Sequence, residues 1–149
     1  MRVHLPREHA STMLGSARAT GRVLTMTPMQ KALKLLSYWM FFCTFAMLAF
    51  GMVLFTFANN TVAVIMAALA AACIAFDVML GVLGRGAAAD AEKALKMRNV
   101  ILTALVFNAV AIAWFVLWNG MVVPVVANAV SVFVFAVVAH LVNEQAKRA

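Results

Sequence analysis

Charged residues are scarce in this sequence. Its 149 residues include twelve Lys or Arg and only five Asp or Glu, so that 11% are charged, whereas soluble domains contain about 25%. Apolar residues make up 66% of the chain, and a soluble protein of this size has too little interior to bury them. The composition therefore excludes an ordinary soluble domain and predicts that lipid surrounds much of the protein.

Cysteine is almost as rare, and the motifs of common catalytic sites are missing. Cys43 and Cys73 both lie in apolar runs, without CxxC spacing or a neighbouring His, so we interpret them as small apolar side chains rather than metal ligands. The chain has no glycine-rich phosphate loop, no HExxH motif and no paired carboxylates. We therefore expect no enzyme activity, no metal and no cofactor. The sequence also carries no motif that assigns it to a known family.

Long apolar runs are what the sequence has instead. Each is close to the length of about 20 residues that a helix needs to cross a hydrocarbon core of about 30 Å. None alternates as barrel strands do, so helices are the remaining way to satisfy backbone groups in lipid. The sequence thus predicts an all-α integral membrane protein with four transmembrane helices, at residues 35–57, 62–83, 100–118 and 121–142.

The connections between these segments predict two antiparallel helical hairpins. Residues 58–61 join the first pair and residues 119–120 join the second, and both contain Asn or Gly, which suit tight turns. A longer loop, 84–99, separates the hairpins. We expect Gly81, Gly84 and Gly86 to loosen the end of the second helix, and Asp90 to cap a new helix ahead of the third span.

Basic residues predict the orientation of the helices. All twelve lie in the N-terminal arm 1–34, the loop 84–99 or the tail 143–149, and the two short connections carry none. The positive-inside rule then places both termini in the cytoplasm, most simply at a bacterial inner membrane. The residues expected to contact anionic headgroups of the inner leaflet, or a partner, rather than nucleic acid, are Arg18, Arg22, Lys31, Lys34, Arg85, Lys93, Lys96 and Arg98.

The N-terminal arm leaves two interpretations open. Its basic residues alternate loosely with Val, Leu and Met, which would suit an amphipathic segment lying on the membrane surface. A disordered basic tail fits the same composition.

Asp77 is the strongest candidate for a functional residue, because a charge within a membrane helix is costly and rare. Counting from the start of the predicted second helix places it in the inner third of the membrane. From there it could anchor the helix in a salt bridge with Arg85 or another basic residue. The alternatives are that it handles ions or protons, or that it contacts a partner.

Three other polar residues lie inside the predicted spans. His140 falls near the inner end of the fourth helix, where it either faces Asp77 or meets headgroups. Asn108 is expected in the inner half of the membrane and Asn128 in the outer half, so the two amides are not expected to form one cluster. We interpret them as hydrogen-bonding groups that join helices.

Small residues recur every four positions on the second predicted helix, at Ala63, Ala67, Ala71 and Ala75. Such spacing lets two helix backbones approach closely. The pattern predicts that this helix is the central packing helix or a contact between subunits.

Two functions follow from these observations. The sequence favours a non-catalytic inner-membrane subunit that packs with other membrane subunits, for example in a secretion, transport or respiratory complex. The alternative is a channel, pore or small transporter built from copies of this chain, in which Asp77 handles ions or protons.

Overall fold

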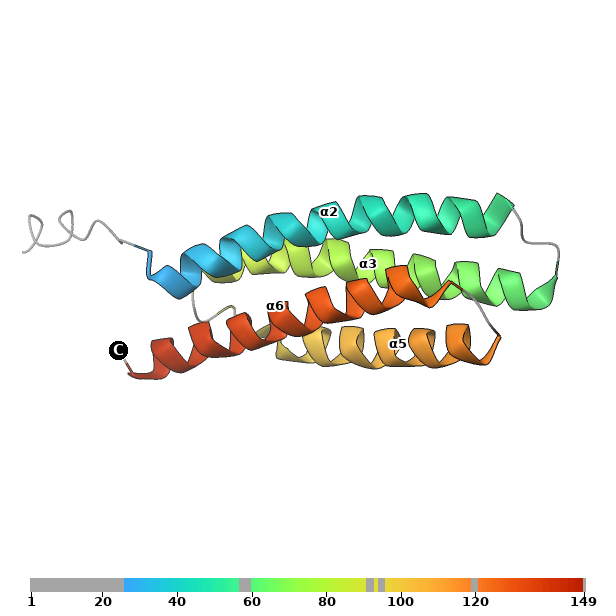
Figure 1. Cartoon of the computed structure of the whole chain (residues 1–149). Helices are drawn as coiled ribbons and strands as arrows, with labels where there is room; N and C mark the ends of the chain where they lie inside the picture. Colours follow the sequence, from blue (N-terminus) through green and yellow to red (C-terminus); the bar gives the residue numbers. More distant parts are fainter. Residues whose placement is uncertain (1–25, 57–59, 91–92, 94–95, 119–120, 149) are drawn as a thin grey trace, which may run out of the picture.

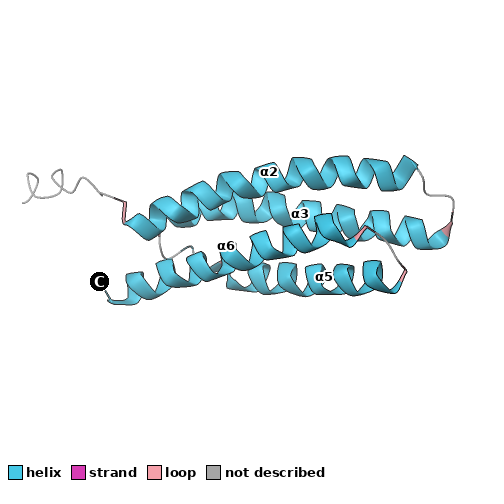
Figure 2. Ribbon diagram, viewed as in Figure 1, coloured by secondary structure: helices cyan, strands magenta, loops and turns pink. Residues whose placement is uncertain are grey.

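The described part of the chain is all-helical. The computed structural model describes residues 26–56, 60–90, 93, 96–118 and 121–148; Figure 2 shows helices and short loops in them, and no strand. Four helices there are long and apolar enough to span a membrane, which supports an integral membrane protein. They are α2 (Pro28–Thr56), α3 (Thr61–Ala89), α5 (Arg98–Leu117) and α6 (Val122–Arg148).

The helices form an elongated bundle in which their axes lie roughly side by side (Figure 1). α2 packs against α3 and α6, and α5 packs against the same two helices. α3 and α6 also touch, and α2 meets α5 through the Phe50 and Phe115 rings, whose centroids lie 5.8 Å apart. α3 is therefore in contact with all three other helices. The start of α2 and the end of α6 lie at the same end of the bundle (Figure 1).

α2 begins at Pro28, seven residues before the predicted start of the first span at 35. The Thr27 hydroxyl accepts a hydrogen bond from the Gln30 backbone N–H at 3.3 Å, and the Gln30 side chain accepts one from the Thr27 N–H at 2.8 Å. This reciprocal pair is a capping box, with Pro28 in the first helical position. Lys31 and Lys34, which we placed in a separate arm, therefore belong to α2, while residues 1–25 lie outside the described part.

α3 continues to Ala89, so the prediction that three glycines loosen its end after residue 83 is wrong. Gly81 and Gly84 are both buried. An added Cβ at Gly81 would lie 3.0 Å from the Phe41 ring, and one at Gly84 would lie 2.6 Å from Phe135 Cζ and would also meet the Ser37 hydroxyl. Two of the three glycines thus let side chains of α2 and α6 approach the α3 backbone, and the packing outweighs their weak helix propensity.

The other helix ends also differ from their predicted positions. Asp90 ends α3 as its C-cap, with its backbone N–H bonded to Gly86 O. α5 starts at Arg98 after Met97. Of the predicted intervening helix, Lys93 and Lys96 are helical, and residues 91–92 and 94–95 lie outside the described part. α6 runs six residues past the predicted end at 142, and Lys147 and Arg148 occupy its last turn. Basic residues there interact favourably with the negative end of the helix dipole.

Two apolar clusters make up the core. One contains Leu33, Met40, Leu80 and Phe135, toward the end of the bundle where α2 begins. The other contains Phe50, Met66, Cys73 and Phe115, toward the opposite end. On α3 the first cluster includes Leu80 and the second includes Cys73, with Asp77 between them. The boundary between the two apolar clusters is therefore where the polar residues lie.

Candidate functional site

Asp77 lies near the middle of α3, and its side chain is 0% exposed. Sixteen residues separate it from Thr61 and twelve from Ala89, which correspond to roughly 24 Å and 18 Å along the axis. The predicted position in the inner third of the membrane was counted from the start of the second helix, which the structure moves by one residue, to Thr61, so it stays a prediction. With the longer helix, the carboxylate lies more than three turns from either end.

Asp77 belongs to a hydrogen-bonded polar cluster, here defined as Asp77, Asn108 and Asn128. The Asn128 amide on α6 donates to Asp77 Oδ1 at 3.2 Å and to Asn108 Oδ1 at 3.3 Å. The Asn108 amide on α5 donates in turn to the backbone oxygen of Ala104 at 2.9 Å. The polar cluster thus joins α3, α5 and α6 across the interior of the bundle.

The prediction that Asn108 and Asn128 do not form one cluster is wrong, because their side chains are hydrogen-bonded. Asn108 lies nine residues before the end of α5, and Asn128 lies six residues after the start of α6. Those spacings differ in height by about 4–5 Å, which two amide side chains easily span. The prediction assigned each Asn to the inner or outer half of its own segment. In the bundle the two residues lie at nearly the same height.

Two oxygens of the polar cluster have no hydrogen-bond partner among the described residues. They are Asp77 Oδ2 and Asn128 Oδ1, and the exposed fractions of Asn108 and Asn128 are only 1% and 3%. Buried polar atoms without partners are uncommon and call for an explanation. A carboxylate oxygen can take up a proton, and carboxylate and amide oxygens both coordinate hard cations. The described residues contain no group of three or more His, Cys, Asp and Glu that would hold a metal ion.

No described basic residue neutralises Asp77. The two salt bridges in the described ranges are Lys93–Asp90 and Lys147–Glu144. The Arg85 guanidinium instead lies over the Tyr38 ring, 5.5 Å from its centroid, so the predicted pairing of Asp77 with Arg85 is wrong. Arg85 is also eight residues further along α3, roughly 12 Å from Asp77.

His140 does not face Asp77 either. It is exposed and lies twelve residues beyond Asn128 on α6, about 18 Å along the helix axis. Its side chain lines a shallow groove between α5 and α6 together with Arg98 and Asn143. The alternative that His140 meets headgroups stays a prediction.

A groove between α2 and α6 reaches the polar cluster from the outside of the bundle. Its volume is about 170 Å³, and its lining includes Trp39, Cys43, Asn128 and Ser131. The Trp39 indole N–H donates to the Ser131 hydroxyl at 3.1 Å, and Cys43 Sγ lies 3.6 Å from the same oxygen. The sequence offered one signal for this link, because Asn128 and Ser131 are three residues apart on a helix and so share a face.

The predicted small-residue line does not form the packing surface of α3 within one chain. Ala71 and Ala75 are exposed, and Ala63 and Ala67 are half-buried. The buried positions lie on a neighbouring face and include Met66, Ala70, Cys73, Asp77 and Leu80. The line of alanines therefore remains a candidate contact between chains. Within the bundle, the buried residues just named make the close contacts of α3.

The predicted headgroup contacts are exposed wherever the structure describes them. These residues are Lys31, Lys34, Arg85, Lys93, Lys96 and Arg98. Arg18 and Arg22 lie outside the described residues.

Comparison with known proteins adds no relative. No family model matches the chain, and neither a curated protein nor a solved structure does.

Proposed function

We propose that this protein is a small membrane transporter or channel in which Asp77 binds a proton or a monovalent cation. The observation that carries the proposal is a fully buried carboxylate in the middle of a membrane-length helix, bonded to Asn128 and paired with no described basic residue. An unpaired charge at that depth costs at least about 2.5–3.5 kcal/mol. A bound proton or cation removes that cost, so the site gains affinity for such an ion.

The geometry of the polar cluster supports a binding role over a purely structural one. A structural salt bridge needs a basic partner, and Arg85 is engaged with Tyr38 instead. The oxygens of Asp77 and Asn128 that lack partners supply acceptor atoms at one level of the bundle. The α2–α6 groove gives Asn128 contact with the outside of the bundle. The sequence suggested two functions, a membrane subunit and a channel or transporter, and these features favour the channel or transporter.

Flux measurements on the purified full chain in liposomes test this proposal. We expect the wild-type protein to dissipate an imposed gradient of protons or alkali cations, and Asp77→Asn to reduce the rate at least about tenfold, as expected when the ion-binding group is removed. Asn keeps the shape and the capacity to hydrogen-bond, so the fold should survive, which circular dichroism checks. Asp90→Asn is the matched control, because it removes an acid that lies outside the polar cluster. Well-folded wild-type protein that moves neither protons nor alkali cations would rule the function out.

The second candidate, a non-catalytic subunit of a larger membrane assembly, is favoured by the exposed line of Ala71 and Ala75. Small residues facing outward allow a partner helix to approach closely. Ala71→Leu should then release co-purifying membrane proteins, or copies of the chain, without lowering the thermal stability of the isolated protein. A wild-type protein that purifies from mild detergent as a monomer without partners would contradict this candidate.

The finer topology belongs to the same proposal. We infer two antiparallel hairpins with both termini in the cytoplasm of a bacterium, supported by the distribution of basic residues in the sequence. Cysteine substitutions at Asn60 and Lys93 should then be labelled from opposite sides of the membrane. Labelling of both from the same side would contradict the arrangement.

A further inference from the structure

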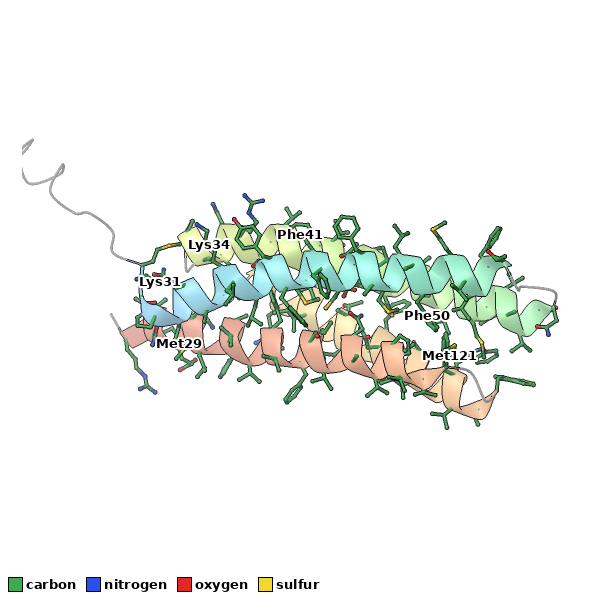
Figure 3. All side chains as sticks on the ribbon, turned by 45° about the horizontal axis from the view of Figure 1, so that its top comes forward. Met29, Lys31, Lys34, Phe41, Phe50 and Met121 are labelled. Atoms are coloured by element: carbon green, nitrogen blue, oxygen red, sulfur yellow. The ribbon has the colours of Figure 1, made fainter. Side chains whose placement is uncertain are left out.

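A basic groove lies between α2 and α3, near the end of the bundle where α2 begins. It is lined by Met26, Lys34, Val82, Arg85, Gly86 and Ala89, and its volume is about 420 Å³. Two of the six lining residues are cations and none is acidic. Figure 3 shows Lys34 near the start of α2, at the end of the bundle away from Phe50 and Met121.

Close packing of α2 and α3 holds the two cations on one side of the bundle. Gly84 brings the α3 backbone against Ser37 of α2, and the next residue on each helix is Arg85 and Tyr38. The guanidinium of Arg85 then lies 5.5 Å from the centroid of the Tyr38 ring, within the range of a cation–π interaction. Lys34 precedes Tyr38 by four residues, so both occupy the same face of α2. The groove is therefore built by the helix contact rather than by two unrelated surface residues.

The charges in this groove favour an anion. Neither Lys34 nor Arg85 takes part in the salt bridges of the described residues, which join Lys93 to Asp90 and Lys147 to Glu144. Two positive side chains lining one groove repel each other, and an anion bound between them attracts both and so outweighs that repulsion. Arginine presents a planar fork of donors that fits two phosphate oxygens at once, and lysine adds a compact charge.

The height of the groove matches that of lipid phosphates. The midpoint of α3 is Ala75, and half of a hydrocarbon core of about 30 Å corresponds to about ten residues of helix. With Ala75 at the middle of the bilayer, Arg85 lies at the edge of the hydrocarbon core, and its long side chain reaches the headgroup layer just beyond it, where the phosphates lie. Val82, which is 57% exposed, lies almost one turn deeper and presents an apolar surface to acyl chains. A free phosphate ion would use the cations but not this surface.

We propose that the groove is a binding site for the phosphate group of an anionic phospholipid. Arg85 donates to two phosphate oxygens while Tyr38 holds its guanidinium in place, and Lys34 supplies the second charge. Phosphatidylglycerol suits the groove, because phosphatidylcholine carries an ammonium group that both cations repel. This site is separate from Asp77, so it can fail or succeed independently of the proposed transport function.

The full chain in neutral detergent provides the test. Thermal unfolding is followed while phosphatidylglycerol, phosphatidylcholine or inorganic phosphate is added, because a ligand that binds the folded state raises the Tm in a saturable way. We expect saturable stabilisation by phosphatidylglycerol alone. Arg85→Gln should raise the half-saturating lipid concentration about tenfold, as expected for the loss of a charge-assisted hydrogen bond, and Lys34→Gln should raise it less.

Controls separate a built site from general surface charge. The double variant Lys147→Gln/Arg148→Gln removes the same net charge as Lys34→Gln/Arg85→Gln, but from the end of α6. It should keep the wild-type response to phosphatidylglycerol, as should Asp77→Asn. An equal loss in both double variants, or equal stabilisation by phosphatidylcholine, would overturn the proposal. Full stabilisation by inorganic phosphate alone would show that the groove binds free phosphate rather than a phospholipid, and would overturn the proposal.

Discussion

Two stretches of the α2–α3 interface contain small residues, and they pack in opposite ways. At Gly84 of α3, an added Cβ would meet Phe135 Cζ at 2.6 Å and also the Ser37 hydroxyl. At Gly51 of α2, an added Cβ would find its nearest neighbours, Ala70 and Ile74, at 3.9 Å. The first stretch is closed by side chains, whereas the second borders a groove of about 300 Å³.

The difference shows that a small residue creates a close helix contact only where a partner fills the space it leaves. Near Gly84 the ring of Phe135 arrives from a third helix, α6, and Phe41 of α2 lies against Gly81 one turn earlier. Near Gly51 the groove is lined by Ala67 and Ala71 together with larger side chains such as Ile74, and the side-chain atoms nearest an added Cβ lie 3.9 Å away. Both stretches contain a glycine, but the expected cost of adding a methyl group differs between them.

The largest effect is expected at Gly84. Gly84→Ala forces a methyl group against the Phe135 ring, and overpacking of this kind costs about 1–3 kcal/mol, which outweighs the gain of roughly 1 kcal/mol in helix propensity. Thermal unfolding of the purified protein should show a clear fall in Tm. The double variant Gly84→Ala/Phe135→Leu should recover part of the loss.

Gly86 provides the control for this prediction, because it lies two residues further along the same helix. An added Cβ there would lie 3.8 Å from the Lys93 side chain, an ordinary contact. Gly86→Ala should therefore leave the Tm unchanged or raise it. If Gly84→Ala left the Tm as high as Gly86→Ala does, the close packing around Gly84 would make no difference to stability, and the contrast between the two stretches of the interface would be wrong.

Gly81 is expected to show a smaller effect of the same sign. An added Cβ would lie 3.0–3.2 Å from atoms of the Phe41 ring, and that ring is only half-buried, so it can shift outward at modest cost. Gly81→Ala should lower stability by less than Gly84→Ala, by about 1 kcal/mol or less. Phe41→Leu in the same chain should abolish the difference from wild type. A larger loss at Gly81 than at Gly84 would reverse the predicted order.

The sequence predicted the helical class of the protein because lipid imposes a simple rule. Apolar runs near 20 residues long indicate spans wherever they occur, and all four correspond to helices in the structure. Their ends were less predictable, because capping acts outside the apolar run. The signal for the start of α2 was present in Thr27, Pro28 and Gln30, but hydropathy alone points to residue 35.

The polar cluster was predictable only in part. Asp77, Asn108 and Asn128 stood out individually as polar residues in apolar helices, and the structure joins them through Asn128. Their meeting depends on the heights and rotations of three helices, which one sequence does not specify. The same limitation explains Gly84: the residue is visible in the sequence, but the ring that approaches it comes from α6.

The smallest effect, and one of opposite sign, is expected at Gly51. Its surroundings leave room for a methyl group, because the nearest atoms of Ala70 and Ile74 would lie 3.9 Å from it. Alanine restricts the unfolded chain more than glycine and favours helix, so Gly51→Ala should stabilise the protein by about 0.4–1 kcal/mol. A rise in Tm for Gly51→Ala together with a fall for Gly84→Ala would show that the effect of a methyl group depends on whether neighbouring side chains already fill the space. A fall at both would instead mean that α2 and α3 are close-packed along their whole length, with no free space at the groove.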